Sequence, residues 1–148
     1  MARPTPFFGE IIVNELKQDV NLKQAILAAL STQSGIVLAI LFGSLAAGKG
    51  RVESDLDLAV DAGRRLTASE KMTLIAELAE RTGRPVDGVD IHAIGEPLLG
   101  QILQHGKRMM GSDTHYANLI YKHLLDQADF LPYRNRILAE RRQTWIGK

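Results

Sequence analysis

The sequence lacks several features that would assign it to a particular class of protein. It has no cysteine among its 148 residues, which excludes disulfides and thiolate metal sites. Its 18 basic and 17 acidic side chains leave a net charge of +1, which gives no electrostatic surface for a nucleic acid. No apolar run reaches the length of a membrane span, and the amino terminus does not have the pattern of a signal peptide. We therefore expect a cytoplasmic protein that binds neither nucleic acid nor membrane.

The composition is that of one ordinary globular domain, 45% hydrophobic and 24% charged. Apolar periodicity and turn residues predict alternating helices and strands. Thr67 and Glu70 have the spacing of a capping box, which marks the start of a helix. We expect helices at 14–30, 67–82, 96–105, 112–128 and 132–146, and strands at 36–42, at 55–60, around Asp87 and at 107–110.

A Gly-Ser pair followed by two aspartates is the most informative pattern in the chain. Gly43 and Ser44 follow the first predicted strand, and Asp55 and Asp57 lie in the second, with residues 45–54 between the two pairs. Glycine lets the backbone approach a ligand closely, and a serine at the start of a short helix offers a hydroxyl and amides to phosphate. The pattern predicts a phosphate-binding turn beside a pair of carboxylates.

The two aspartates are expected to share one face of their strand. Side chains alternate along a strand, so Asp55, Asp57 and Ala59 should lie on a charged face while the apolar residues between them face the core. Carboxylates two residues apart are separated by roughly 6.5–7 Å at the backbone, a spacing that suits a shared divalent ion or a metal pair. Hard oxygen ligands favour Mg²⁺, or Mn²⁺, over zinc.

With these residues, the chain resembles the polymerase-beta-like nucleotidyltransferase superfamily. The resemblance implies an α/β (α+β) fold, in which a small mixed sheet is flanked by helices and followed by C-terminal helices. It implies ATP as substrate and two Mg²⁺ ions as cofactors, held by Asp55 and Asp57. The phosphates would be bound by Gly43 and Ser44. The whole chain, residues 1–148, is then a single nucleotidyltransferase domain with a core of about 14–110 and a C-terminal helical segment of about 112–147.

The superfamily uses a third carboxylate on a later strand, and two aspartates are candidates for it. The run from Gly83 to Asp87 resembles the form of this strand in small bacterial members, which favours Asp87 as the third catalytic and metal-binding residue. Asp90 follows in a similar context. The two lie on opposite strand faces unless Gly88 marks a bulge, so both remain candidates. In the loop before the aspartate pair, Lys49 and Arg51 are candidates to neutralise phosphate charge.

At this chain length, the resemblance narrows to the minimal nucleotidyltransferases of the MntA antitoxin type. Members of that group transfer AMP from ATP to a tyrosine of a HEPN-domain ribonuclease toxin and so neutralise it. The resemblance therefore implies a protein adenylyltransferase that acts as an antitoxin, with a HEPN toxin as partner in a hetero-oligomer. Alternatives are a non-catalytic antitoxin that masks its toxin by binding, and a small-molecule adenylyltransferase of the aminoglycoside-modifying kind.

Aromatic side chains gather near the C-terminus, together with arginines. Such residue types anchor protein interfaces, but terminal helices also use aromatics to pack on their own domain, so both roles remain open. The residues concerned are Tyr116, Tyr121, Phe130, Tyr133, Arg134, Arg136, Arg141, Arg142 and Trp145.

Overall fold

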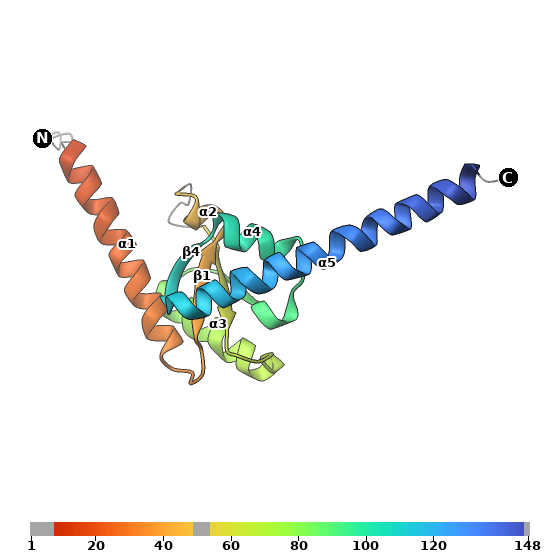
Figure 1. Ribbon diagram of the computed structural model, residues 1–148. Coiled ribbons are helices and arrows are strands. Elements are labelled where there is room, and N and C mark those ends of the chain that lie inside the picture. The colour runs from red at the N-terminus through yellow and green to blue at the C-terminus, as the bar shows by residue number, and fades with distance from the viewer. Residues whose placement is uncertain (1–7, 49–53, 147–148) are drawn as a thin grey trace, which may run out of the picture. The chain divides into compact units, whose positions relative to one another are not determined.

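A four-stranded mixed sheet forms the centre of the first of two compact units, Met1–Gly111 and Ser112–Lys148. The computed structural model of the chain describes residues 8–48 and 54–146 (Figure 1). The strand order is β3-β2-β1-β4, and β1 is antiparallel to both of its neighbours, whereas β2 and β3 are parallel. The expected mixed α/β architecture is confirmed. The strands are β1 (Leu38–Phe42), β2 (Leu56–Asp61), β3 (Val86–Asp90) and β4 (Lys107–Gly111).

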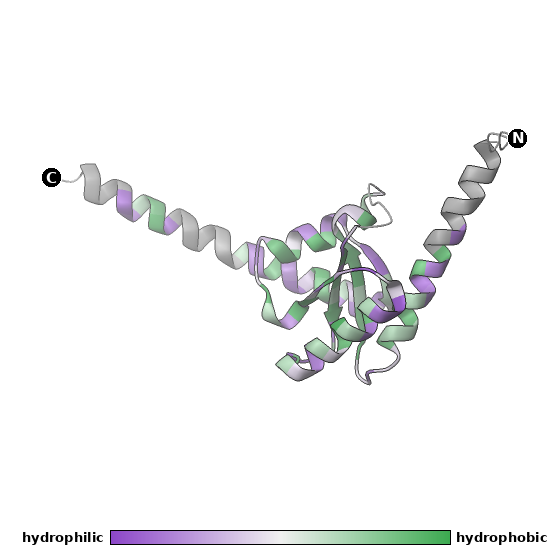
Figure 2. Cartoon of the chain, turned by 180° about the vertical axis from the view of Figure 1, so that it is seen from behind, coloured by the Kyte–Doolittle hydropathy of each residue, from purple (hydrophilic) through white to green (hydrophobic). Residues whose placement is uncertain are grey.

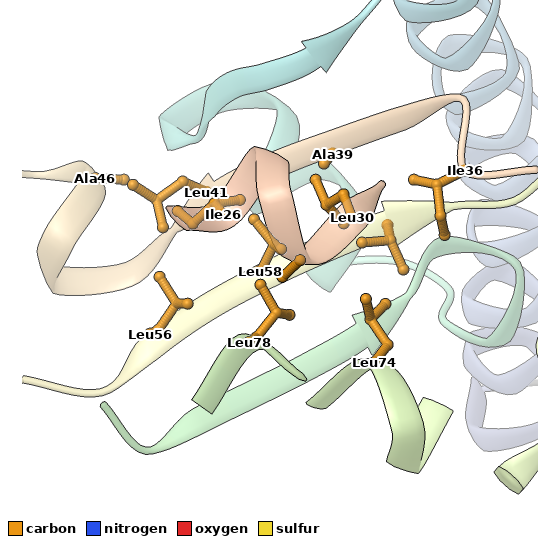
Figure 3. Close-up of a cluster of buried hydrophobic side chains, with 12 residues drawn as sticks. Ile26, Leu30, Ile36, Ala39, Leu41, Ala46, Leu56, Leu58, Leu74 and Leu78 are labelled. Atoms are coloured by element: carbon orange, nitrogen blue, oxygen red, sulfur yellow. The ribbon is translucent and has the colours of Figure 1, made fainter. Parts of the chain in front are cut away.

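Two helices cover one face of this sheet and form the main hydrophobic core with it. These are α1 (Phe8–Leu30), which begins six residues before the predicted start at Asn14, and α3 (Ala68–Thr82), which contacts α1. Each fully buried leucine or isoleucine contributes about 1.5–3 kcal/mol, so a one-residue slip of β2 would be costly. The core residues are Ile26, Ala29, Leu30, Ile36, Ala39, Leu41, Ala46, Leu56, Leu58, Val60, Leu74 and Leu78 (Figure 3).

The opposite face of the sheet is also apolar at its middle, which corrects one prediction. Ile40 and Ala59 are partners in the ladder between β1 and β2, and they are only 1% and 0% exposed. On that side α4 (Leu98–His105) contacts β1 and buries Leu99 and Ile102. The expectation of a charged face is therefore wrong at Ala59, because a second apolar layer forms there. Figure 2 shows the strands as a strongly hydrophobic part of the chain.

Both ends of α3 are fixed by local sequence, as the capping-box pattern predicts. The hydroxyl of Thr67 accepts a hydrogen bond from the Glu70 amide, and the Glu70 carboxylate accepts one from the Thr67 amide at 3.0 Å. Gly83 ends the helix with φ 67°, a left-handed conformation that suits glycine. The helix therefore begins and ends at defined residues, and β3 starts three positions after Gly83.

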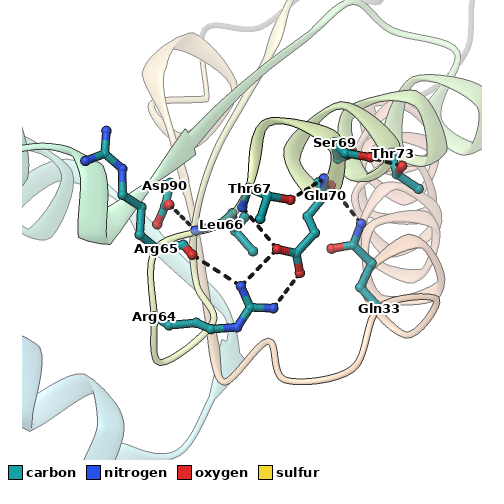
Figure 4. Close-up of polar contacts among 9 residues, drawn as sticks. All are labelled: Gln33, Arg64, Arg65, Leu66, Thr67, Ser69, Glu70, Thr73 and Asp90. Carbon is teal, nitrogen blue, oxygen red and sulfur yellow. Dashed lines mark hydrogen bonds and ion pairs between the residues drawn. The ribbon is translucent and has the colours of Figure 1, made fainter.

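Glu70 also connects α3 to two other segments (Figure 4). Its carboxylate accepts a hydrogen bond from the Arg64 guanidinium at 2.9 Å, and its carbonyl oxygen accepts one from the Gln33 side chain at 2.8 Å. The bond from Arg64, with the Thr67 amide, lowers the pKa of Glu70 to about 2. Since the pKa is lowered, the stabilising effect is present above the ordinary value of 4.5 and is lost as the pH falls through about 2.

The second unit contains one long helix where the sequence predicts two. Helix α5 (Asp113–Ile146) continues through Pro132, so the predicted break between 128 and 132 is absent. A proline removes one helical hydrogen bond, but its fixed φ is itself helical, so a long helix can continue past it. None of the described helices is long and apolar enough to cross a membrane.

The capping box generates a first prediction. Thr67→Ala should lower the free energy of unfolding by about 1 kcal/mol, because the Glu70 amide loses its acceptor at the start of α3. The measurement is urea unfolding at neutral pH. Ser69→Ala is the matched control, since it removes a hydroxyl from the same turn and leaves the box intact. Equal losses in the two variants would contradict this account of the cap.

Candidate active site

The Gly-Ser pair lies at the point where β1 ends and a short helix begins. Gly43 and Ser44 open α2 (Gly43–Ala46), and both residues are exposed. Gly43 has φ 72°, and no side chain caps the turn at Phe42. The predicted turn with a short helix start is therefore present. Its exposed backbone and the Ser44 hydroxyl are available to an anion.

Asp57 lies directly against this turn. It is the ladder partner of Phe42, the residue before Gly43. A Cβ atom built on Gly43 would stand 3.0 Å from Cγ of Asp57 and would overlap its carboxylate oxygen Oδ2. Only glycine allows the backbone so close to this carboxylate. The two halves of the sequence pattern, separated by a long spacer, thus meet in space.

Asp87 completes a group of three carboxylates. In the parallel ladder between β2 and β3, Asp57 is opposite Asp87, and paired residues of neighbouring strands point to the same side. Asp55 immediately precedes β2 and is exposed. The pKa of Asp57 is raised, first because burial penalises its charge, and then because the charges of Asp87 and Asp55 repel it. The three form one cluster of negative charge.

Asp90, the alternative third carboxylate, lies elsewhere. The ladder between β2 and β3 runs without a bulge from Leu56 to Val60, so Asp90 points to the opposite face from Asp87. It is 3% exposed, and its carboxylate accepts a hydrogen bond from the amide of Leu66 at 2.7 Å (Figure 4). It also accepts one from the amide of His92 at 3.0 Å. Asp90 therefore has a structural role, because it binds the backbone just before α3 and just after β3.

Gly88 does not mark a bulge, and its lack of a side chain has another cause. A Cβ atom there would stand 2.9 Å from Cγ1 of Ile75 on α3. Glycine therefore lets α3 approach β3 closely. Strand β3 is regular at Gly88, and a regular strand sends Asp87 and Asp90 to opposite faces.

Other polar residues stand in different positions. His92, for which the sequence shows no partner, places its Nε2 2.7 Å from Oδ1 of Asp61, which ends β2 far along the strand from Asp57. Lys49 and Arg51, the predicted phosphate-binding side chains, lie outside the described residues. Arg84 is not among the residues that the sequence predicts for the site, and its one signal is its place in the run from Gly83 to Asp87. Its guanidinium donates a hydrogen bond to the carbonyl oxygen of Ser54, the residue before Asp55, at 3.1 Å.

The donor set suits a hard divalent cation in its chemistry. Within 8–48 and 54–146, no three His, Asp or Glu side chains converge closely enough to hold a metal ion as placed. Asp55, Asp57 and Asp87 nonetheless supply carboxylate oxygens only, and their mutual repulsion is what a bound cation relieves. The residues therefore fit Mg²⁺ or Mn²⁺ better than a softer metal.

Comparison with a family model decides what kind of protein this is. The model described as polymerase beta, nucleotidyltransferase matches residues 24–115, more than half of the chain. The chain belongs to this family. The match includes the Gly43 turn and all three carboxylates, and it confirms the resemblance and the assignment to the nucleotidyltransferase enzymes. No curated protein matches the sequence.

Several solved structures contain a chain with the same fold as this member of the polymerase beta nucleotidyltransferase family. A chain in a crystal structure of a toxin–antitoxin with AMP-PNP has a TM-score of 0.70 and 25% identity, over 81% of this chain and 98% of that one. A chain in a structure of a tri-AMPylated Shewanella oneidensis HEPN toxin in complex with an MNT antitoxin has a TM-score of 0.66 and 23% identity, over 84% and 98% of the two chains. A chain of the toxin–antitoxin MntA–HepT has a TM-score of 0.65 and 23% identity, over 82% and 97%.

The contact between the turn and the carboxylate generates a second prediction. Gly43→Ala should abolish nucleotidyl transfer, because the new methyl group must displace Asp57. Gly48→Ala is the matched control, since Gly48 has φ 71° against 72° for Gly43 but nothing within 4 Å of its Cβ position. Both variants therefore have the same backbone strain, but only Gly43→Ala displaces Asp57. Transfer rates and urea unfolding are measured for both. Equal loss of transfer in the two variants would contradict the prediction.

The raised pKa of Asp57 generates a third prediction. The folded chain holds this proton more tightly than the unfolded chain, so above the raised pKa the charge of Asp57 destabilises the fold. Asp57→Asn should raise the Tm at pH 7 in metal-free buffer, and the gain should vanish as the pH falls to the ordinary value of 3.8. Glu80→Gln, at an exposed position of α3, should leave the Tm unchanged. A lower Tm for Asp57→Asn at pH 7 would refute the repulsion.

Proposed function

We propose that this chain is a Mg²⁺-dependent adenylyltransferase that moves AMP from ATP to a protein hydroxyl. The acceptor is a tyrosine of a cognate HEPN ribonuclease toxin, and the modification makes the chain an antitoxin. The observation that carries the proposal is the meeting of Asp57 with Gly43 on one side and Asp87 on the other. A phosphate-binding turn and a group of hard ligands in contact are what transfer of a nucleotide requires.

The comparisons support the choice of substrate and partner. The neighbour at 25% identity was crystallised as a toxin–antitoxin with AMP-PNP, an ATP analogue. Another neighbour with the same fold stands in complex with a HEPN toxin that carries AMP groups. These facts belong to those proteins, and they make ATP and a HEPN toxin the first substrates to test here.

In the proposed reaction, the chain's own residues position the reacting groups. The backbone at Gly43 and the Ser44 hydroxyl bind the outer phosphates, with Lys49 and Arg51 as further charge partners. Asp55, Asp57 and Asp87 hold Mg²⁺, which when bound neutralises charge that develops on the phosphates. Those three carboxylates are the proposed catalytic residues.

Asp87 also orients the acceptor hydroxyl and takes its proton. The acceptor oxygen forms a bond to the α-phosphorus while the bond from that phosphorus to the oxygen bridging to the β-phosphate breaks. Pyrophosphate leaves, and AMP remains on the acceptor. The fold contributes by placing these groups in line.

A second function, masking of the toxin by binding alone, is favoured by one observation. The part of α5 with described side chains exposes the large apolar residues Tyr121, Leu124, Leu125 and Leu138, which suit a protein contact. We propose the segment of about 112–147 as a partner-binding extension of the single nucleotidyltransferase domain. Binding through this segment is compatible with catalysis, so only the chemical state of the toxin separates the two functions.

Transfer to the toxin gives a fourth prediction. Asp55→Asn and Asp57→Asn should each reduce incorporation of AMP from labelled ATP into the HEPN partner by about 10²–10³-fold or more, because each removes a charge needed at the reacting phosphates. Glu80→Gln should retain wild-type incorporation. Toxin that has been treated with the wild-type chain and ATP and then repurified should have gained the mass of AMP and lost its ribonuclease activity. Full recovery of ribonuclease activity with no added mass would overturn the transferase and leave masking.

A further inference from the structure

Asp55 stands outside the sheet that fixes the other two carboxylates. Strand β2 begins at Leu56, so the ladders on its two sides hold Asp57 between Phe42 and Asp87. Neither ladder includes Asp55, and its side chain is exposed. A metal ligand must keep its place within a fraction of an ångström. The position of Asp55 therefore depends on contacts other than strand pairing.

The connection between α3 and β3 supplies such contacts on both sides of Asp55. The guanidinium of Arg84 donates a hydrogen bond from Nη1 to the carbonyl oxygen of Ser54 at 3.1 Å. The amide of Leu56 donates to the carbonyl oxygen of Pro85 at 2.8 Å. The residues before and after Asp55 are thus held by two consecutive residues of one connection.

The sequence around Arg84 makes this connection a firm anchor. Gly83 ends α3 in the left-handed conformation, its amide bonded to the carbonyl of Ala79 at 2.9 Å. Pro85 has a fixed φ and few conformations to lose on folding. The Arg84 side chain is half-buried and reaches 30 positions back along the chain. A charged donor makes a stronger bond to a carbonyl than a neutral donor does.

We infer that Arg84 is a positioning residue for nucleotidyl transfer, which holds Asp55 beside Asp57 through the Ser54 carbonyl. The inference rests on the proposed role of Asp55 in the reaction. Without this bond, Ser54 loses its contact with the connection before β3, and we expect Asp55 to shift relative to Asp57 and Asp87. A misplacement of about 1 Å costs on the order of 10²-fold in rate, so a bond remote from the phosphates controls the chemistry.

The kinetic test compares two changes at Arg84 with a control on α3. Arg84→Met removes the donor and should lower kcat for AMP transfer by about tenfold or more, with the KM for ATP within about threefold of wild type. Arg84→Lys keeps a cationic donor and should restore part of the loss. Arg81→Met removes a guanidinium paired with Glu77 at 3.1 Å within α3 and should retain wild-type kcat. An increase in KM for ATP with kcat unchanged would overturn the inference, because it would show that Arg84 binds the nucleotide itself.

Metal binding gives a readout that does not depend on turnover. Mn²⁺ is titrated in the presence of a non-hydrolysable ATP analogue and followed by electron paramagnetic resonance, with circular dichroism as the check on folding. Arg84→Met should weaken Mn²⁺ binding about fivefold or more if Asp55 is a ligand, and should weaken it no further in the Asp55→Asn background. Equal, additive losses in both backgrounds would overturn the inference. If Arg84→Met does not fold, Arg84→Lys is carried through the same cycle with the same criterion.

AMP transfer by this chain and the positioning role of Arg84 are tested by different results. If the wild-type chain transfers no AMP to the HEPN partner, the proposed function fails, and the Mn²⁺ cycle still decides the role of Arg84. If the wild type transfers AMP and Arg84→Met matches it in kcat and in Mn²⁺ affinity, the role of Arg84 is wrong and the proposed function stands.

Discussion

The parallel pairing of β2 with β3 holds Asp57 and Asp87 side by side against their electrostatic repulsion. The negative cluster at the candidate site depends on this register, because the ladder between β2 and β3 places the two carboxylates opposite each other. The register is maintained from the other face of the sheet, where Leu56 and Leu58 are fully buried at about 1.5–3 kcal/mol each. Burial of this size exceeds the repulsion of partly exposed charges, so the core can hold the site in an unfavourable arrangement.

Strand β3 contains two aspartates, Asp87 and Asp90, that have different roles. Asp87 and Asp90 are three positions apart, and a regular strand sends them to opposite faces. One contributes charge to the cluster around Asp57. The other is buried, and its two carboxylate oxygens accept hydrogen bonds from the amides of Leu66 and His92. The same residue type thus stabilises the fold on one side and loads it with repulsion on the other.

The parts of the fold that the sequence predicted are those controlled by nearby residues. The cap at Thr67 and the end of α3 at Gly83 follow from short patterns, and the contact of the Gly43 turn with Asp57 follows from one pattern on two successive strands. Other features depend on distant or cumulative effects. The burial of Ala59 comes from a second apolar layer, and the bond from Arg84 to Ser54 joins positions 30 apart. Helix α5 continues through a proline because the residues on both sides of it are helical. Periodicity alone contains none of these.

The crossover through α3 has a consequence for how the site comes into being during folding. In the sequence, Asp57 precedes this helix and Asp87 follows it, so no short fragment of the chain contains the cluster. Parallel strands cannot pair until the crossover between them has closed, which makes their contacts late and non-local. Catalytic competence therefore arises together with the complete first unit. A nascent or partly unfolded chain would have helices and a turn but no active centre, and the activity would report cooperatively on the integrity of the whole fold.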